Sequence, residues 1–241
     1  MDKVIITGAS RGIGRETALA LARKGYGLYL VSSRSGEELS ELKEKIAGEY
    51  GVFCETLLLD VADPSAVEEA FSGILGKDTV YALINNAGVA SYELMTDMSV
   101  EAWKRMIDVN LNACFYTSRM VVPQMVRNRR GRIINVSSVW GSAGASMETA
   151  YSAAKGGLNA FTKALGKELA PSNVQVNAVS FGYIDTKMNA HLSKEEAEEL
   201  SREIPMDRPG TAKEAAMMIE KILEAPDYLT AQVITMDGGW I

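Results

Sequence analysis

Short apolar segments alternate along the chain with longer segments in which apolar residues recur at helical spacing. Several of the short segments are apolar almost throughout, which is typical of strands buried on both faces of a parallel sheet. The pattern predicts seven strands, at residues 3–7, 27–32, 52–59, 80–85, 132–137, 174–180 and 232–236. It predicts helices between them, at residues 12–24, 36–49, 64–75, 100–128, 150–169 and 211–224.

This order of strand, helix and strand decides the expected fold class. Successive parallel strands need crossover connections, and helices in those connections cover the two faces of the sheet. We therefore expect an α/β protein with a doubly wound, seven-stranded parallel sheet and helices on both faces. The sequence contains no internal repeat, low-complexity tract or linker, so residues 1–241 are interpreted as a single domain.

Residues 182–210 interrupt the alternation between the sixth and seventh predicted strands. This connection is long, and it contains an acidic helical pattern at residues 193–203. Long excursions after strand ends in such sheets commonly carry function as lids or substrate walls. We interpret residues 182–210 as a substrate-side loop or lid, and the alternative is a surface excursion without a role.

Charge and composition exclude several function classes. The net charge of −6 disfavours nucleic-acid binding, because phosphate contacts need concentrated positive charge. The most basic run, Arg127–Arg132, is interpreted as a solvated turn, with a docking patch for an acidic partner as the alternative. No apolar run reaches the roughly 18 residues of a membrane span, and the N-terminus lacks a signal-peptide layout.

The two cysteines, Cys54 and Cys114, lie among apolar neighbours without a metal-ligand spacing. They are interpreted as buried thiols, and no metal site is expected. A reducing cytoplasm is the compartment that suits such thiols.

The segment "TGASRGIG", Thr7–Gly14, joins the first predicted strand to the first predicted helix. Glycine permits a sharp turn and a close approach of backbone to ligand, and the helix start presents free N–H groups to a pyrophosphate. The strand–turn–helix context is that of the Rossmann dinucleotide-binding fold. A plain tight turn is the alternative.

The end of the second predicted strand bears on which dinucleotide binds. Proteins that bind NAD usually place an acidic residue there for the ribose hydroxyls. This chain instead has Ser32, Ser33 and Arg34, and Arg11 adds positive charge inside the glycine turn. A guanidinium attracts a 2′-phosphate, so the sequence predicts NADPH rather than NADH as the cofactor.

Two tyrosine–lysine pairs share the spacing i, i+4, namely Tyr151 with Lys155 and Tyr183 with Lys187. Residues four apart lie on one face of a helix, so the spacing alone fits an ordinary helix as well as a proton-transfer pair. Tyr151 and Lys155 fall within a predicted helix. Tyr183 and Lys187 fall in the irregular segment beside Gly182 and are assigned to the cofactor-side loop.

Several motifs, taken in order, resemble the short-chain dehydrogenases/reductases over nearly the whole chain. They are "TGASRGIG" (7–14), "LDVAD" (59–63), "NNAG" (85–88), "VNL" around Asn110, "NVSS" (135–138) and "YSAAK" (151–155). Within that family the chain is most similar to the 3-oxoacyl-(acyl-carrier-protein) reductases. The resemblance implies NADPH-dependent reduction of a ketone, with a 3-oxoacyl thioester as the expected substrate.

The resemblance also implies roles for individual residues. The expected catalytic set is Ser138, Tyr151, Lys155 and Asn110. Ser138 would hydrogen-bond the carbonyl, Tyr151 would donate the proton, Lys155 would hold the ribose and lower the pKa of the phenol, and Asn110 would bind a water. The expected cofactor-binding residues are Gly8, Ser10, Arg11, Gly12, Ile13, Gly14, Ser33, Arg34, Asp60, Val61, Asn86, Ala87, Gly88, Tyr151, Lys155, Ile184 and Thr186.

Three other residues near this set are interpreted separately. Ser137 is expected to face away from the site, because adjacent residues of a strand point to opposite faces. The single histidine, His191, is left outside the site. Phe181 replaces a proline that is common in the family before Gly182, which would place an aromatic ring near the nicotinamide end of the cofactor.

Partners follow from the same resemblance. Arg129 and Arg130 are candidate contacts for an acidic acyl carrier protein, although no basic residue follows the predicted helix 150–169 at Pro171-Ser172-Asn173. A homotetramer is implied, with the two longest helices packed against symmetry mates and the chain end "DGGWI" near another interface.

Two alternatives remain open at the level of sequence. One is a short-chain enzyme acting on another small ketone or alcohol, and the other is a cofactor-sensing protein without catalysis. A set of large side chains could line an adaptable apolar pocket or belong to the core: Met95, Trp140, Met147, Met188 and Met206.

Overall fold

A computed structural model describes residues 1–190 and 192–241 of the chain. Its main sheet has seven strands in the order β3-β2-β1-β4-β5-β6-β9, and every pair of neighbours is parallel. The strands are β1 (Lys3–Thr7), β2 (Gly27–Ser32), β3 (Cys54–Leu58), β4 (Val80–Asn85), β5 (Gly131–Ser138), β6 (Val174–Phe181) and β9 (Val233–Met236). The predicted fold class is confirmed, and the strand bounds differ from prediction by at most two residues.

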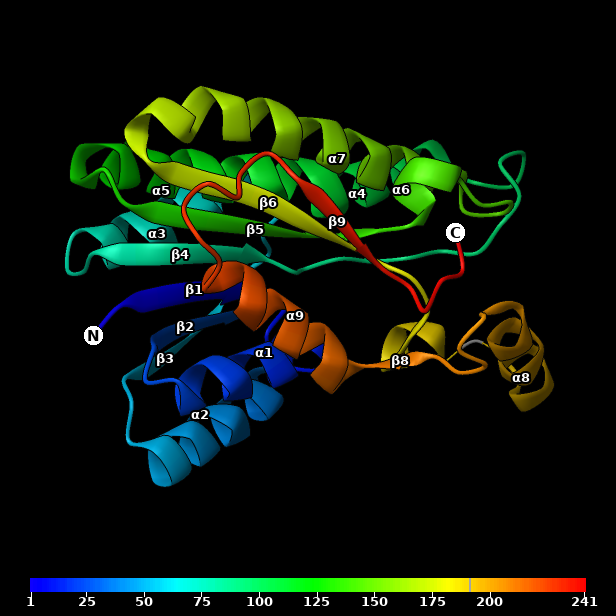
Figure 1. The fold of residues 1–241 in the computed structure, drawn as a ribbon, viewed down its shortest axis with the longest axis horizontal. Helices are drawn as coiled ribbons and strands as arrows, with labels where there is room; N and C mark the ends of the chain where they lie inside the picture. The colour runs from blue at the N-terminus through cyan, green and yellow to red at the C-terminus, as the bar shows by residue number, and fades with distance from the viewer. Residues whose placement is uncertain (191) are drawn as a thin grey trace.

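Helices cover both faces of this sheet (Figure 1). One face carries α1 (Gly12–Arg23), α2 (Gly36–Tyr50) and α9 (Ala212–Leu223), and the other carries α3 (Pro64–Leu75), α4 (Val100–Ile107), α5 (Ala113–Asn128) and α7 (Thr149–Leu169). Each face has its own hydrophobic core. Leu21, Leu42 and Ile219 lie in the first core, and Phe71, Val121 and Leu169 lie in the second.

The strand order places a topological switch point between β1 and β4. From β1 the chain builds outward through β2 and β3, and it then returns to build the other half from β4. In open parallel sheets ligands bind in the crevice at the carboxyl ends of the strands, at this point. The fold therefore directs attention to the carboxyl edge of the sheet, where Thr7, Asn85 and Ser138 end their strands.

The predicted helix at 100–128 is interrupted, which corrects the expectation of one continuous helix. Residues Asp108–Asn112 form a single π-helical turn between α4 and α5. The Asn110 side chain donates to the carbonyl oxygens of Met106, at 3.0 Å, and Val89, at 2.9 Å. A side chain inserted into the backbone hydrogen-bond ladder widens the turn, and such bulges are frequent at functional sites.

The 182–210 segment contains more structure than the sequence pattern indicated. The predicted acidic helix is present as α8 (Lys194–Glu203), which starts with a capping box between Ser193 and Glu196. Two short strands that the pattern missed, β7 (Ile184–Asp185) and β8 (Gly210–Thr211), pair in parallel and bring the two ends of the segment together. A further short helix, α6 (Trp140–Ala143), follows β5 directly.

Candidate active site

The glycine turn between β1 and α1 is built by close backbone packing. Gly8 and Gly12 have φ values of +65° and +55°, in the left-handed region that other residues rarely adopt. A Cβ atom on Gly14 would lie 2.2 Å from the Gly8 carbonyl oxygen, so only glycine lets the helix begin this close to the turn. The arrangement confirms the strand–turn–helix geometry that the sequence predicts.

The start of α1 fits an anionic ligand. Its N-cap, Arg11, makes no side-chain capping bond, and no acidic residue lies in the first turn. The first N–H groups therefore lack a side-chain acceptor, which is the arrangement that binds a pyrophosphate. A hollow of about 360 Å³ opens here, lined by polar and basic residues that include Ser10, Arg11 and Thr186, and also by the carboxylates of Glu16, Glu38 and Glu41. The hydroxyls, guanidinium groups and helix start fit the phosphates of a dinucleotide.

The adenosine side of the crevice lies beyond the ends of β2 and β3. Ser33 and Arg34 are exposed directly after β2, with no acidic residue at that position. Asp60 is partly exposed after β3 and forms an ion pair with Arg105 of α4, at 2.7 Å. Burial acts to raise the pKa of the Asp60 carboxyl and is the largest single effect, but the hydrogen bonds from Arg105 and the Ala62 backbone N–H, together with the charges of Arg105 and Arg34, hold the pKa below its ordinary value. No motif in the sequence pointed to Arg105.

The segment after β4 is fixed by Thr7, which sequence reasoning did not single out. The Thr7 hydroxyl accepts hydrogen bonds from the backbone N–H groups of Asn86 and Ala87, both at 3.0 Å. The Asn86 side chain donates in return to the carbonyl oxygens of Thr7 and Gly8. Asn86 and Ala87 therefore lie against the glycine turn. Thr7 was recognisable as the last residue of a strand before a glycine turn.

Ser138, Tyr151 and Lys155 meet at the carboxyl end of β5. Ser138 ends that strand, and its side chain acts on the Tyr151 hydroxyl in the direction that lowers the pKa of the phenol. Tyr151 and Lys155 both belong to α7, and the Lys155 ammonium lies 5.5 Å from the centre of the Tyr151 ring. The buried Lys155 Nζ donates to the carbonyl oxygen of Val136, at 2.8 Å. The structure thus brings three of the four predicted catalytic side chains together.

Burial dominates the acid–base properties of this cluster. It raises the pKa of the Tyr151 phenol to about 12; the Glu148 carboxylate acts in the same direction, and the Ser138 hydrogen bond opposes both. Burial also lowers the pKa of the Lys155 ammonium to about 8, with the Cys114 thiol acting the other way. The expectation that Lys155 lowers the pKa of the phenol is therefore not met by these side chains alone, because desolvation of the phenolate has the larger effect.

Asn110, the fourth member of the predicted set, lies beside this cluster in the π-helical turn. It is fully buried, and its Oδ1 accepts from the backbone N–H of Val89, at 3.2 Å. A Cβ atom on Gly88 would lie 2.9 Å from the Asn110 Oδ1 and 3.8 Å from the Lys155 Nζ. Gly88 therefore lies between Asn110 and Lys155, and the absence of its side chain leaves them close to one another.

Ser137 and the second tyrosine–lysine pair, Tyr183 with Lys187, lie apart from this cluster. Ser137 donates to the Asn159 side chain at 2.7 Å, on the side of the strand away from Ser138, as expected. Tyr183 precedes β7, whereas Lys187 lies in a separate 3₁₀ turn and forms an ion pair with Glu38, at 3.5 Å. These two residues do not share a helix. His191 falls outside the described residues.

Other predicted residues occupy mixed environments. Ile184 is buried in the core, while Thr186 caps the 3₁₀ turn and approaches Gly12. Phe181 is also buried in the core at the end of β6, and the position of its ring relative to the nicotinamide stays a prediction. Ile13 is half-buried and Val61 is buried.

The five large side chains that could line an apolar pocket lie outside the core. Met95, Met188 and Met206 are exposed, and Trp140 and Met147 are half-buried.

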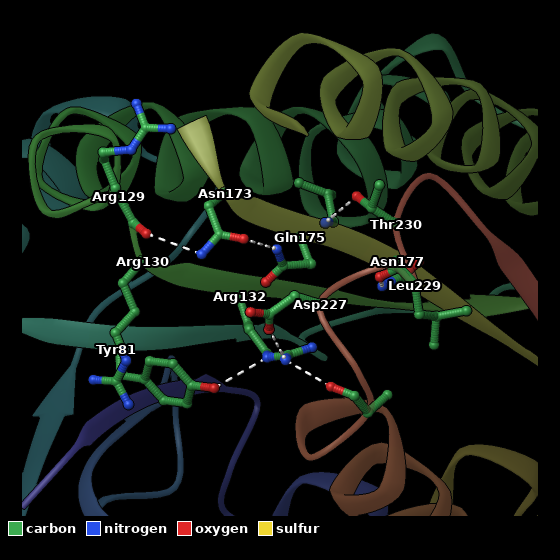
Figure 2. Close-up of polar contacts among 12 residues, drawn as sticks. Tyr81, Arg129, Arg130, Arg132, Asn173, Gln175, Asn177, Asp227, Leu229 and Thr230 are labelled. Carbon is green, nitrogen blue, oxygen red and sulfur yellow. Dashed lines mark hydrogen bonds and ion pairs between the residues drawn. The ribbon is translucent and has the colours of Figure 1, made fainter. Parts of the chain in front are cut away.

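Arg129 and Arg130 lie at the other edge of the sheet. Both precede β5, so the eight residues of that strand, about 25 Å, separate them from Ser138. Arg130 forms two hydrogen bonds with the Asp2 carboxylate, at 2.7 and 2.8 Å, and lies over the Tyr81 ring. Figure 2 shows this region, where Arg132 reaches the Tyr81 hydroxyl and Asp227.

The remaining expectations concern metals, membranes and thiols. Within residues 1–190 and 192–241, no cluster of histidine, cysteine, aspartate or glutamate could hold a metal ion. In the same residues, no helix has the length and apolarity to span a membrane. Cys54 and Cys114 are free and buried, and burial raises the pKa of each thiol to about 11.

Comparison with known families decides the classification. The family model for short chain dehydrogenases matches residues 2–197 of this chain. The chain belongs to the short-chain dehydrogenase family. It is accordingly an oxidoreductase.

Similar short-chain dehydrogenases include several 3-oxoacyl-[acyl-carrier-protein] reductases. The FabG protein of Aquifex aeolicus is 38% identical over 237 residues, which cover 98% of this chain and 95% of that protein. The FabG protein of Thermotoga maritima is 37% identical, covering 98% and 96%. The uncharacterized oxidoreductase YmfI of Bacillus subtilis is also 37% identical, covering 98% and 97%.

Among solved structures, the chain resembles a protein of Beutenbergia cavernae assigned as an NAD(P) dependent gluconate 5-dehydrogenase. The TM-score is 0.93 at 30% sequence identity, and the match covers 99% of this chain and 96% of that one. That structure contains bound NADP at low occupancy.

Proposed function

We propose that this short-chain dehydrogenase catalyses NADPH-dependent reduction of a ketone, and that the ketone is a 3-oxoacyl thioester. The observation that carries the proposal is the meeting of Ser138, Tyr151 and Lys155 at the carboxyl edge of the sheet, with the Lys155 ammonium 5.5 Å from the centre of the Tyr151 ring. Full-length similarity to several 3-oxoacyl-[acyl-carrier-protein] reductases supports the thioester as substrate.

Ser138 and Tyr151 act together on the carbonyl oxygen. NADPH supplies a hydride to the carbonyl carbon when it is bound. The Ser138 hydroxyl donates to the carbonyl oxygen and stabilises the negative charge that develops there. Tyr151 then transfers its phenolic proton to this oxygen. A phenol whose pKa burial raises stays protonated at neutral pH, which suits a proton donor in the direction of reduction.

Lys155 and Asn110 restore that proton. The Lys155 pKa, lowered to about 8, leaves the ammonium able to give up a proton near neutrality. Asn110 lies beside it in the π-helical turn and, through Gly88, close to the cofactor segment. We assign to Asn110 the positioning of Lys155 and of a water that reaches solvent. Lys155 also holds the hydroxyls of the nicotinamide ribose.

The preference for NADPH rests on charge. Arg34 is exposed at the end of β2 where an acidic residue would otherwise receive the adenosine ribose, and Arg11 lies in the turn nearby. A planar guanidinium pairs well with the 2′-phosphate that distinguishes NADPH from NADH.

A carrier protein that docks on Arg129 would deliver its substrate to the active site of a neighbouring subunit, because Arg129 is far from Ser138 of its own chain. Arg129 is exposed at the amino edge, about one strand length from Ser138 of the same chain. In the proposed homotetramer, α5 and α7 pack antiparallel against symmetry mates, which places the amino edge of one subunit near the carboxyl edge of the next. The test is Arg129→Glu, which should slow turnover of a carrier-bound substrate and leave a small thioester unaffected. Arg130 is the weaker candidate because Asp2 already neutralises it.

Two further assignments belong to the same proposal. The 182–210 segment, tied at its base by the β7–β8 pair, forms the substrate-side wall. The cytoplasm is the proposed location, since both buried cysteines are free thiols.

The deciding experiment is a spectrophotometric assay of NADPH and NADH oxidation with an acetoacetyl thioester, alongside simple ketones and 5-ketogluconate. We expect thioester turnover, with a higher kcat/KM for NADPH than for NADH. Preference for the sugar ketone would instead favour a dehydrogenase like the B. cavernae relative. Tight NADPH binding without turnover of any ketone would favour a cofactor-sensing protein and contradict the proposal.

A further inference from the structure

The chain ends at the carboxyl edge of the sheet, between α6 on one side and the 182–210 segment on the other (Figure 1). Trp240, the penultimate residue, packs edge-to-face against Trp140, with ring centres 4.9 Å apart. Trp140 is the first residue of α6, and its backbone N–H donates to the Ser138 hydroxyl oxygen, at 3.2 Å. The indole pair is therefore joined to Ser138 through the backbone of Trp140.

The tail that carries Trp240 is held in a defined conformation. The Asp237 carboxylate accepts hydrogen bonds from the backbone N–H groups of Gly239 and Ile241, both at 2.9 Å. Gly238 and Gly239 have φ values of +72° and +85°, so this turn requires glycine at both positions. The sequence "DGGWI" thus specifies a turn that directs the indole back toward α6.

The tail also packs against both ends of the proposed substrate wall. A Cβ atom on Gly182 would lie 2.7 Å from the Asp237 Cβ, so the glycine after β6 makes room for the tail. On the other side, a Cβ atom on Gly238 would lie 2.8 Å from the Ile204 Cγ2 and 3.5 Å from the Met206 Cβ. The tail therefore connects the end of β5, through Trp140, with residues 204–206 that follow α8.

The surface beside this pair is apolar and partly open. Trp240 is half-buried against Trp140, and Met206, which lies against the tail at Gly238, is 60% exposed. A half-buried indole pair with an exposed methionine beside the tail offers an adaptable surface for an apolar ligand. A substrate with its carbonyl on Ser138 would extend its acyl chain along this surface.

We propose that Trp240, stacked on Trp140, is a specificity-determining residue that binds the acyl chain of the substrate and favours medium-chain over short-chain 3-oxoacyl groups. This inference rests on the proposed reduction of 3-oxoacyl thioesters and adds which acyl groups are preferred. The contact contributes only when the chain is long enough to reach the indoles, so its effect grows with chain length.

The test compares kcat/KM for the acetoacetyl and 3-oxooctanoyl thioesters of one small thiol, in the wild type and in Trp240→Ala. Removal of an apolar contact to substrate is worth about tenfold or more in kcat/KM. We expect Trp240→Ala to lower kcat/KM at least tenfold for the 3-oxooctanoyl thioester and less than threefold for the acetoacetyl thioester. The KM for NADPH should stay unchanged. Trp240→Phe should restore most of the lost preference.

The chain offers a matched control in Tyr228, an aromatic residue that is fully exposed in the connection between α9 and β9. Tyr228→Ala should leave both substrates unaffected. Equal losses for the two chain lengths in Trp240→Ala, or no loss for either, would overturn the role of Trp240 while leaving the reductase activity standing. Failure of the wild type to reduce either thioester would overturn the proposed function, and this inference with it.

Discussion

The two edges of the sheet carry charged and polar groups in opposite ways. At the amino edge, cations are matched with carboxylates: Lys3 with Asp78, Arg130 with Asp2, and Arg132 with Asp227. At the carboxyl edge, Tyr151 and Lys155 are desolvated, and burial moves the pKa of each away from its ordinary value. Compensated charge is typical of structural contacts, whereas perturbed groups in a crevice are typical of chemistry.

Arg132 shows what the amino edge does. Its side chain is only 7% exposed, and it donates to the Tyr81 hydroxyl, the Ala225 carbonyl and the Asp227 carboxylate. These contacts attach the connection between α9 and β9 to β4 and β5 (Figure 2). The amino edge therefore secures the strands whose far ends position Ser138 and Asn85. The comparison predicts that substitutions at the carboxyl edge lower the rate of catalysis, whereas substitutions at the amino edge lower the stability of the fold.

The largest expected effect comes from Tyr151→Phe. Removal of the phenolic hydroxyl takes away the proton donor, and general acid catalysis contributes about 10²–10⁴-fold, so kcat should fall by about that factor. The thermal midpoint of unfolding should hardly change, because the ring remains in place. The matched control is Tyr183→Phe, in the pair with the same spacing, which should keep its rate. A similar loss in both variants would contradict the assignment of Tyr151.

The next effect concerns cofactor choice. Arg34→Ala removes a charged donor to the 2′-phosphate, and hydrogen bonds to charged groups are worth about 1.5–3 kcal/mol. The KM for NADPH should rise about 10–100-fold, while the KM for NADH changes little. Arg129→Ala, at the amino edge, serves as the control and should alter neither constant with a small thioester. An equal rise in the KM values for NADPH and NADH would show that Arg34 does not contact the 2′-phosphate.

Substitution at the amino edge should affect stability instead. Arg132→Met leaves the Tyr81 hydroxyl and the Ala225 carbonyl without their donor, so we expect the free energy of unfolding to fall by about 2 kcal/mol. Urea denaturation measures this change, and kcat/KM below the unfolding transition should stay within about twofold. A large loss of kcat/KM in a variant of unchanged stability would break the distinction between the edges.

The smallest effect concerns the start of α9. Glu214 forms a capping box with Thr211 and pairs with Arg208; the Arg208 hydrogen bond is the main cause that lowers the Glu214 pKa to about 2. Because its pKa is depressed in the folded state, the Glu214 carboxylate contributes its full stabilisation at pH values above the ordinary pKa of a carboxyl group. This contribution is lost as the pH falls toward 2. Glu214→Gln should cost less than about 1 kcal/mol near pH 7, because the pair is partly exposed.

The pH dependence provides the check on Glu214. The difference in stability between wild type and Glu214→Gln should shrink as the pH is lowered from 5 toward 2, since the wild-type carboxyl becomes neutral there. Thermal unfolding at several pH values measures it. A difference that stays constant over this range would contradict a charged contribution from Glu214.

The sequence by itself determined the features that repeat or lie close together along the chain. Apolar periodicity gave the seven strands and most helices, because burial on two faces of a sheet imposes that pattern locally. The glycine turn and the Tyr151–Lys155 ridge were equally readable, since turn geometry and helix spacing are short-range properties.

The tertiary structure decided what depends on contacts between distant segments. In the π-helical turn the Asn110 side chain is hydrogen-bonded to the distant backbone of Val89, and burial is the main cause of the shifted pKa values of Tyr151 and Lys155. The stacking of Trp240 on Trp140 and the neutralisation of Arg130 by Asp2 each join residues about a hundred or more positions apart. No local pattern encodes such contacts, because they form only when the packed sheet brings its edges, its chain ends and its long connection together.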